Sequence, residues 1–162
     1  MDIQLRTPVA EDGLAVHQLI ADNPPLDTNS LYCNLLQTSH FAHTAIAAEV
    51  DGELVGFVSG YLKPEQPDTY FLWQVVVGSA ARGQGLAKRM IKALFERPNF
   101  AAVNWLETTI TPDNEASQKL FRSVARDWQA EVQVSVMFDR EQHFGGRHNT
   151  EELYRIGPVA KS

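Results

Sequence analysis

The sequence contains 162 residues, of which 44% are hydrophobic and 21% are charged, a composition typical of about one globular domain with a buried core. Its formal net charge of −6 argues against a nucleic-acid-binding protein, because such proteins usually carry a basic face for the phosphates. A cationic or zwitterionic small molecule suits an acidic chain better. Cys33 is the only cysteine, which excludes an internal disulfide and a cysteine-based zinc site.

The N-terminal residues do not resemble a targeting segment. The stretch "MDIQLRTPVAEDG" lacks the basic and apolar regions of a signal peptide, and no apolar run approaches the ~18 residues of a membrane span. No repeat or linker-like tract divides the chain. We therefore expect a single domain over residues 1–162, located in the cytoplasm, with no membrane partner.

The first part of the chain predicts one strand and two helices. Apolar residues four positions apart, such as Val16 and Ile20, indicate a helix, and "NPP" at 23–25 ends it. The second helix has several N-cap candidates among Asp27 to Ser30. The predicted bounds are a strand at 3–8 and helices at 10–22 and 26–41.

The middle of the chain predicts a hairpin, a further strand and a helix. Asp51-Gly52 is a hairpin signal between two strands within 43–62, and the polar stretch 63–69 reads as a loop. The apolar segment 70–77 is the next strand. After Gly85, apolar residues four apart indicate a helix that ends at Pro98.

The last part alternates strands and helices. We predict strands at 103–111, 131–138 and 151–157, a helix at 112–125 and a polar loop at 139–150. A hairpin followed by alternating strands and helices predicts an α/β (α+β) fold with a mixed sheet and helices on both faces.

The loop "RGQGLA" at 82–87 joins the valine-rich strand to the following helix. Its glycines allow a ligand to approach the backbone, and the free N–H groups of the first helical turn favour an anion such as a pyrophosphate. The loop lacks the Lys-Ser/Thr pair of a Walker A motif and is not a complete dinucleotide-binding fingerprint. A plain strand-to-helix turn is the alternative.

Three motifs together resemble the GNAT N-acetyltransferase superfamily: "VVV" at 75–77, "RGQGLA" at 82–87, and Asn114-x-x-Ser117-x-x-Leu120-Phe121. The order of elements from residue 3 to about residue 157 is similar as well. The resemblance implies the acyl-coenzyme A N-acyltransferase fold, with a mixed sheet of about six to seven strands flanked by about four helices. It also implies acetyl-coenzyme A as cosubstrate and no metal.

The resemblance also implies roles for particular residues. The backbone near Val75 would aim an N–H at the thioester oxygen, and Asn114 would face the pantetheine arm or the reacting end. A tyrosine that donates a proton to the leaving thiolate is replaced by Phe121, so the acid is absent or lies elsewhere, with Tyr32, Tyr70 and Tyr154 as candidates. The implied cofactor-binding residues are Val75, Val76, Val77, Arg82, Gly83, Gln84, Gly85, Leu86, Ala87, Asn114 and Phe121.

Segments outside the cofactor motif resemble the diaminobutyrate acetyltransferases of ectoine biosynthesis, which acetylate the 4-amino group of L-2,4-diaminobutyrate. These segments are 26–49, "FLWQVVV" at 71–77 and "GGRHNTEELYRIG" at 145–157. The resemblance implies a role in osmoprotection and a substrate site that contains Asp27, Tyr32, Trp73 and Glu152.

The chemistry of a diamino acid agrees with these residues. Asp27 and Glu152 would hold the 2-ammonium group, and Tyr32 or Trp73 would offer it a cation–π face. Candidate donors for the substrate carboxylate are Asn29, Asn34 and Arg147, and candidate bases are Glu107, His148 and Glu152, the last of which we assign as catalytic together with Val75 and Asn114.

Each of these residues has a simpler explanation. Asp27 is a typical helix N-cap, Trp73 and Tyr32 could pack in the core, and Glu152 could be an ordinary surface residue. At the level of the whole protein, the alternatives are acetylation of another small amine, such as a polyamine, ornithine or lysine, or a noncatalytic acyl-coenzyme A-binding module. A homodimer is implied by the resemblance alone.

Overall fold

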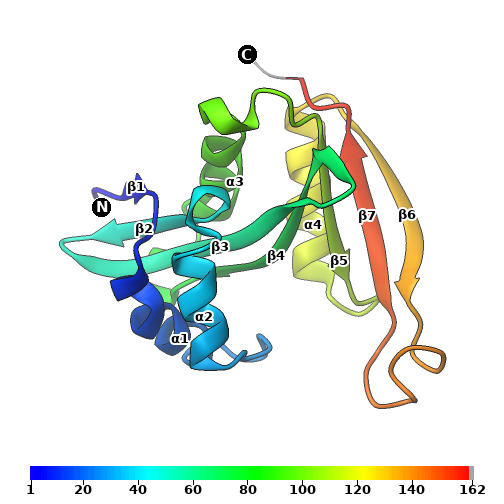
Figure 1. The fold of residues 1–162 in the computed structure, drawn as a ribbon, viewed down its shortest axis with the longest axis horizontal. Coiled ribbons are helices and arrows are strands. Elements are labelled where there is room, and N and C mark those ends of the chain that lie inside the picture. Colours follow the sequence, from blue (N-terminus) through cyan, green and yellow to red (C-terminus); the bar gives the residue numbers. More distant parts are fainter. Residues whose placement is uncertain (161–162) are drawn as a thin grey trace. The chain divides into compact units, whose positions relative to one another are not determined.

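The computed structural model describes residues 1–160, which form one mixed sheet and four α-helices (Figure 1). The hydrogen-bonded strand order is β1-β2-β3-β4-β5-β7-β6, in which β4 and β5 are parallel. This confirms the predicted mixed sheet of the GNAT fold. The strands are β1 Gln4–Arg6, β2 Ile46–Val50, β3 Glu53–Lys63, β4 Gln66–Val77, β5 Trp105–Ile110, β6 Glu131–Phe138 and β7 Glu151–Gly157, and the helices are α1 Gly13–Ala21, α2 Leu31–Thr38, α3 Leu86–Phe95 and α4 Glu115–Asp127.

The chain forms two compact units. Unit 1 contains Met1–Tyr61 and Leu72–Ala101, and unit 2 contains Leu62–Phe71 and the residues from Ala102 onward. Strands β3 and β4 each contribute residues to both units. None of the helices within residues 1–160 has the length and apolar character needed to cross a membrane.

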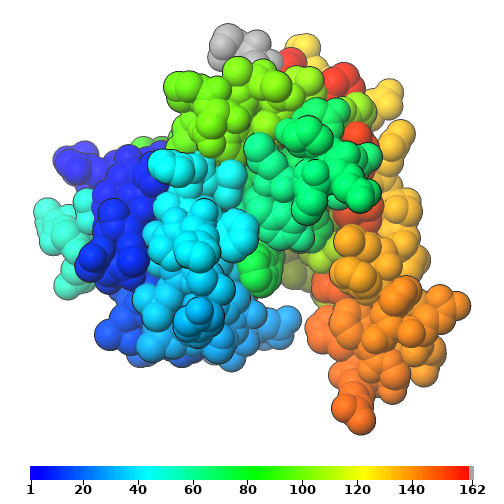
Figure 2. All heavy atoms as spheres, viewed as in Figure 1, coloured from blue at the N-terminus to red at the C-terminus, as the bar shows by residue number. Residues whose placement is uncertain are grey.

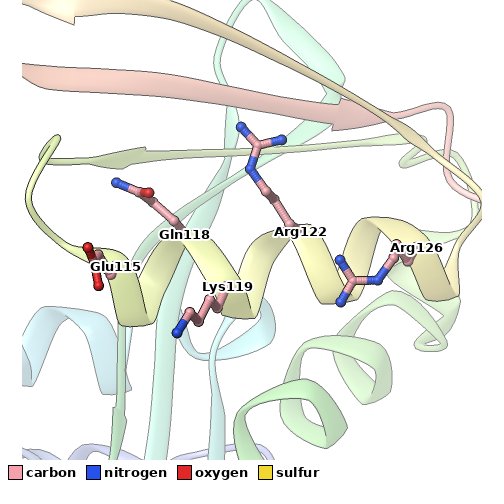
Figure 3. A pocket seen from close by; sticks show the side chains of 5 residues that line it. All are labelled: Glu115, Gln118, Lys119, Arg122 and Arg126. Atoms are coloured by element: carbon pink, nitrogen blue, oxygen red, sulfur yellow. The ribbon is translucent and has the colours of Figure 1, made fainter.

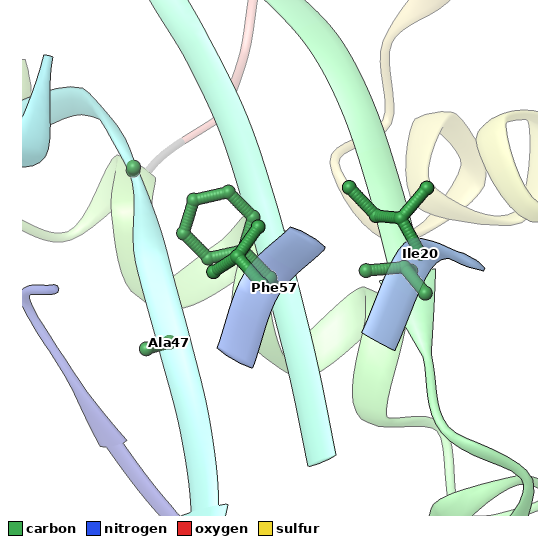
Figure 4. Close-up of a cluster of buried hydrophobic side chains, with 6 residues drawn as sticks. Ile20, Ala47 and Phe57 are labelled. Atoms are coloured by element: carbon green, nitrogen blue, oxygen red, sulfur yellow. The ribbon is translucent and has the colours of Figure 1, made fainter. Parts of the chain in front are cut away.

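The core of unit 1 lies between α1 and the sheet (Figure 4). Val16 and Ile20 of α1 pack with Ala47 of β2, Phe57 of β3 and Val76 of β4, and all five are at most 2% exposed. Burial of these apolar side chains away from water is the main force that fixes α1 on the sheet.

Helix α3 covers the other face of unit 1. A Cβ atom added at Gly56 would lie 3.1 Å from the side chains of both Leu86 and Met90 of α3. Because neighbouring residues of a strand point to opposite faces, Gly56 and the adjacent Phe57 place α3 and α1 on opposite sides of β3. Glycine at this position allows the close approach of α3.

Helix α4 packs in unit 2 through one apolar face. The buried residues of this helix are Phe121, Val124 and Ala125. Trp128, at its C-terminal cap, is buried as well. Tyr154 of β7 is 4% exposed, and the guanidinium of Arg122 lies 5.6 Å from the centre of its ring. Strands β6 and β7 have the predicted bounds of 131–138 and 151–157.

The predicted bounds differ most from the structure at the starts of the second helix and of β4. The second helix begins at Leu31 rather than at residue 26, because the N-cap is Ser30, whose hydroxyl accepts a hydrogen bond from the Cys33 N–H at 3.0 Å. Strand β4 begins at Gln66 rather than at residue 70. Thr69 is already paired with Trp105 of β5, and this pairing extends the strand into a segment whose prolines suggest a loop.

Candidate active site

The predicted anion-binding loop has the backbone that its glycines suggest. Gly83 and Gly85 have φ of +78° and +68°, in the left-handed region that favours glycine. A Cβ atom at either position would meet no heavy atom within 4 Å, so the loop backbone borders open space. Gly85 is the N-cap of α3, and the first-turn N–H groups of this helix receive no side-chain cap. These groups form a partial positive charge suited to a phosphate.

Arg82 holds this loop to the turn that follows α1. Its Nη2 donates to Asn23 Oδ1 at 2.6 Å, and its Nε donates to the Val77 carbonyl at 3.4 Å. Asn23 is 6% exposed, and its Nδ2 donates to the Leu19 carbonyl at 2.7 Å. Arg82 therefore fixes the loop as well as adding positive charge beside it.

The three valines before the loop differ in their surroundings. Val76 is 2% exposed and belongs to the core of unit 1, whereas Val75 and Val77 are half-buried. The side chain of Val76 therefore anchors the strand and is not available to a ligand. The predicted role of the Val75 backbone in holding the thioester oxygen stays a prediction.

Trp73 lies outside the core, contrary to its simpler explanation. Its side chain is 44% exposed and stands edge-on to the ring of Tyr61, with ring centres 6.3 Å apart at 86°. Tyr61 in turn packs against Phe41 at 6.5 Å. The indole is thus fixed by neighbours while much of its surface stays accessible, as a cation–π surface requires. Sequence reasoning missed Tyr61 and Phe41, because neither lies in a recognisable motif.

Asp27 and Tyr32 are both exposed in unit 1. Asp27 lies in the segment before α2 and does not cap that helix, so its N-cap explanation is wrong. Tyr32 is 69% exposed, in the first turn of α2, so it is not a core residue. Both side chains can be reached by a ligand.

Asn34 does not share this accessibility. It is fully buried, its Oδ1 lies 2.9 Å from His17 Nδ1, and its Nδ2 donates to Gln37 Oε1 at 3.0 Å. The Oδ1 contact joins α2 to α1, and the Nδ2 bond stays within α2, so both ends of the amide are used. Asn34 therefore has a structural role here, and the structure argues against it as a donor to the substrate carboxylate.

Asn114 and Glu152 lie at the same end of unit 2. Asn114 caps α4, its Oδ1 accepting a hydrogen bond from the Ser117 N–H at 3.1 Å. Glu152 of β7 is half-buried and pairs with Ile110, the last residue of β5. Because only three residues separate Ile110 from Asn114, the register brings Glu152 to the end of β5 from which the chain enters α4.

The tyrosines offered as proton donors lie in different surroundings. Phe121 is 2% exposed, so its ring belongs to the core of unit 2. Tyr70 is fully buried and Tyr154 is 4% exposed, which leaves Tyr32 as the accessible phenol among the three candidates.

Glu107 is a buried carboxylate with two cationic partners, all in unit 2. It is 3% exposed, and its oxygens accept hydrogen bonds from Lys63 Nζ at 2.9 Å and Arg155 Nη1 at 2.7 Å. Arg155 also lies over the ring of Trp105, 4.0 Å from its centre. Both oxygens are engaged by cations and the side chain is buried, so Glu107 is a structural ion-pair partner, and the structure argues against its role as a base open to the substrate.

The loop at 139–150 is ordered by its own contacts and lies at the surface of unit 2 (Figure 2). The backbone N–H groups of Gln142 and Glu141 donate to Asp139 Oδ2 and hold the pKa of this carboxyl below its usual range. The His148 ring packs against Phe144 at 4.7 Å, with its Nδ1 2.7 Å from the Asn149 carbonyl. Arg147 is exposed.

A cation-rich depression follows the surface of α4 (Figure 3). Lys119, Arg122 and Arg126 line it together with Glu115 and Gln118. In the close-up, Gln118 and Arg122 point to one side of the helix and Lys119 to the other, so these side chains do not converge on one point. Residues 1–160 contain no cluster of three His, Cys, Asp or Glu side chains suited to a metal ion.

Comparison with known proteins agrees with this arrangement. The model of the acetyltransferase (GNAT) family matches residues 14–125. The chain is 55% identical over 156 residues to the L-2,4-diaminobutyric acid acetyltransferase of Methylotuvimicrobium alcaliphilum, covering 96% of this chain and 91% of that protein. The Halomonas elongata protein of the same name is 51% identical, with coverage of 95% and 80%.

A solved structure is similar over the same extent. Diaminobutyrate acetyltransferase EctA from Paenibacillus lautus, in complex with its substrate L-2,4-diaminobutyric acid and coenzyme A, is 38% identical with a TM-score of 0.92. The match covers 99% of this chain and 98% of that one. With a matching family model and relatives of this identity over nearly its whole length, the chain belongs to the acetyltransferase (GNAT) family, in the group of the diaminobutyrate acetyltransferases.

Proposed function

We propose that the chain transfers the acetyl group of acetyl-coenzyme A to the 4-amino group of L-2,4-diaminobutyrate, giving N4-acetyl-L-2,4-diaminobutyrate and coenzyme A. The observation that carries this proposal is its likeness to the Paenibacillus enzyme, which was solved with diaminobutyric acid and coenzyme A bound. The reaction would be a step of ectoine biosynthesis, and the protein would act in the cytoplasm in osmoprotection.

The chemistry is a direct acyl transfer in a ternary complex. The neutral 4-amine attacks the thioester carbonyl, a C–N bond forms, and the C–S bond breaks to release the thiolate. The substrate ammonium, with a pKa near ~10, loses two protons in all. One neutralises the thiolate and the other goes to solvent, so a coenzyme A thiol can leave without a tyrosine at the position of Phe121.

The cosubstrate part of the proposal is supported by unit 1. The left-handed glycines Gly83 and Gly85 open the backbone at the start of α3, where uncapped N–H groups suit the pyrophosphate. The Val75 backbone N–H would polarise the thioester oxygen. Asn114 would contact the pantetheine arm through its Nδ2, because its Oδ1 already caps α4.

The diamine part is supported by exposed groups of matching chemistry. Asp27 would provide a negative charge for the 2-ammonium group, and the accessible rings of Tyr32 and Trp73 would provide cation–π faces. Glu152 would hold the diamine and pass a proton to water. A carboxylate at the 2-amino end leaves the reacting 4-amine free of a partner that raises its pKa.

We infer that residues 1–162 act as one catalytic domain, because β3 and β4 each run through both units and the family match spans both. We also propose a homodimer. Sedimentation at micromolar concentration tests the second point, since a monomer at all concentrations would contradict it.

The test of function is coenzyme A release with a panel of L-2,4-diaminobutyrate, ornithine, lysine, putrescine and spermidine, followed by NMR of the product. Turnover that prefers diaminobutyrate, with the acetyl group on N4, supports the proposal. A preference for a longer amine would place the protein with another small-amine acetyltransferase. Tight binding of acetyl-coenzyme A without turnover on any amine would indicate a noncatalytic module.

A further inference from the structure

Gln74 joins strand β4 to the segment that carries Asp27. Its Nε2 donates to the Asp27 carbonyl oxygen at 2.9 Å. Asp27 lies in the irregular segment between α1 and α2, which leaves regular structure at Asp22 and re-enters it at the N-cap Ser30. A hydrogen bond to the main chain fixes the backbone of Asp27 itself, whichever rotamer its carboxylate adopts.

The strand end of this link is rigid. Gln74 stands two residues before Val76, which is 2% exposed in the core of unit 1. It directly follows Trp73, whose indole is held edge-on by Tyr61. Adjacent residues of one strand therefore hold the exposed indole and the segment with the exposed carboxylate.

The amide of Gln74 is poorly suited to a purely stabilising role. The Asp27 carbonyl can only accept a hydrogen bond, so Nε2 must face it and Oε1 takes the other end. That Oε1 atom is buried and has no hydrogen-bond partner among the residues of the chain that the structure describes. An unpaired buried acceptor opposes folding and offsets the gain from the bond to Asp27. The net effect of the Gln74 amide on the stability of the fold is therefore small, whereas its effect on the position of the Asp27 backbone is specific.

We propose that Gln74 is a positioning residue of the diamine site, which holds Asp27 at a fixed place relative to Trp73. This inference rests on the proposed function, in which both residues bind the diamine. Gln74 acts through the Asp27 backbone and does not itself contact the reacting atoms. Without the Gln74 amide, the Asp27 carboxylate samples a wider range of positions. Substrate binding must then order this segment, and the free energy of that ordering weakens the affinity for the diamine.

The test compares Gln74→Met, which keeps the length of the side chain and removes the amide, with Gln18→Met. Gln18 donates its Nε2 to Asp22 Oδ1 at 2.8 Å on the exposed surface of the same unit, so it is a matched control. In Q74M, we expect faster amide hydrogen exchange in the free protein at Leu26, which precedes Asp27 and whose N–H donates to the Asn23 carbonyl at 3.3 Å. We also expect KM for diaminobutyrate to rise about three- to tenfold, the equivalent of one hydrogen bond, with little change in KM for acetyl-coenzyme A or in Tm.

A cycle with Asp27→Asn makes the test specific. D27N keeps the main-chain carbonyl that Gln74 binds but removes the charge of the side chain. If Gln74 acts by positioning the Asp27 carboxylate, Q74M will raise KM for diaminobutyrate less in the D27N background than in the wild type. Unchanged exchange and unchanged KM in an active Q74M enzyme would overturn the inference, as would equal effects on both substrates. Failure of the proposed function shows differently: the wild-type protein would not turn over diaminobutyrate, and hydrogen exchange would still report whether Gln74 holds the segment.

Discussion

Asp27 and Glu152 are the two carboxylates that we propose bind the diamine. A carboxylate paired with an ammonium contributes more than a neutral hydrogen bond. We expect Asp27→Asn and Glu152→Gln each to raise KM for diaminobutyrate about ten- to hundredfold, with KM for acetyl-coenzyme A nearly unchanged. Steady-state kinetics with each substrate varied in turn measures both values. Glu65→Gln, in the exposed β3–β4 turn, is the control, and equal rises in both KM values would remove these residues from the diamine site.

Gly85 provides a separate test of the cosubstrate loop. An alanine there must adopt φ near +68°, which destabilises the fold by about 1 kcal/mol, although no atom stands in the way of its Cβ. We expect Gly85→Ala also to raise KM for acetyl-coenzyme A, because the methyl group lies at the backbone assigned to the pyrophosphate. Gly52→Ala is the matched control, with φ +83° in the β2–β3 turn and equally open space. Gly52→Ala should show the same loss of stability with unchanged kinetics. A rise in KM for acetyl-coenzyme A in both variants would indicate that the change destabilises the whole fold rather than the loop.

At the scale of elements, the start of α1 is fastened by Asp12. Its carboxylate takes a bidentate contact from Arg6, with Nη1 at 2.8 Å and Nη2 at 2.9 Å, and also accepts the Val9 N–H at 2.8 Å. The hydrogen bond from Arg6 is the main cause of an Asp12 pKa below its ordinary value. This joins β1 to the first turn that leads into α1.

The lowered pKa of Asp12 gives a prediction with a definite sign. A depressed folded-state pKa contributes stability above the unfolded value of about 4, and this is lost as pH falls through the folded value. We expect Asp12→Asn to reduce the free energy of unfolding by about 1 to 3 kcal/mol at pH 7, and the difference from wild type to shrink below about pH 4. Urea titrations at several pH values measure it, with Asp22→Asn at the other end of α1 for comparison. A difference that is constant with pH would contradict the ionic origin.

Much of the fold was predictable because local signals agreed with tertiary packing. The face of α3 that contains Leu86, Met90 and Ile91 and the strand at 131–138 follow from periodicity alone. The start of β4 was not predictable, because Pro67 disfavours a strand in the local sequence. The strand forms there because β4 pairs with β5. The helix at 26–41 shortened because the chain between α1 and α2 is held by side chains such as Gln74, which local propensity does not register.

The candidate site divides in the same way. The loop from Arg82 to Ala87 has a sequence signature, since only glycine adopts its backbone readily. The burial of Asn34 and the pairing of Glu107 have none, because their partners His17, Lys63 and Arg155 lie far away in the sequence. Contacts of that kind are set by strand register and helix packing, which one sequence without structure does not reveal.

At the scale of the whole molecule, Glu107 joins three strands. Its partners Lys63 and Arg155 come from β3 and β7, and Glu107 itself is in β5. Removing the buried carboxylate leaves two cations, with side chains 29% and 25% exposed, without their anionic partner, and the loss of charged hydrogen bonds destabilises by about 1.5 to 3 kcal/mol. We expect Glu107→Gln to lower stability by this amount and, if the chain is one domain, to shift a single unfolding transition.

Scanning calorimetry measures that shift. Glu141→Gln is the matched control, because Glu141 meets Arg140 at 3.6 Å on the open surface and such pairs contribute little. Two separate transitions, of which only one moves in E107Q, would show that the two compact units unfold independently.

Cys33 has a practical consequence. It is the only thiol in the chain, it follows the exposed Tyr32, and its main-chain N–H is held by the Ser30 hydroxyl. Burial raises the pKa of this thiol, so a maleimide reagent reacts with it more readily in mildly alkaline buffer than at neutral pH. The sequence therefore accepts one fluorophore next to Tyr32, where binding of the diamine at the proposed site would change the fluorescence without any substitution.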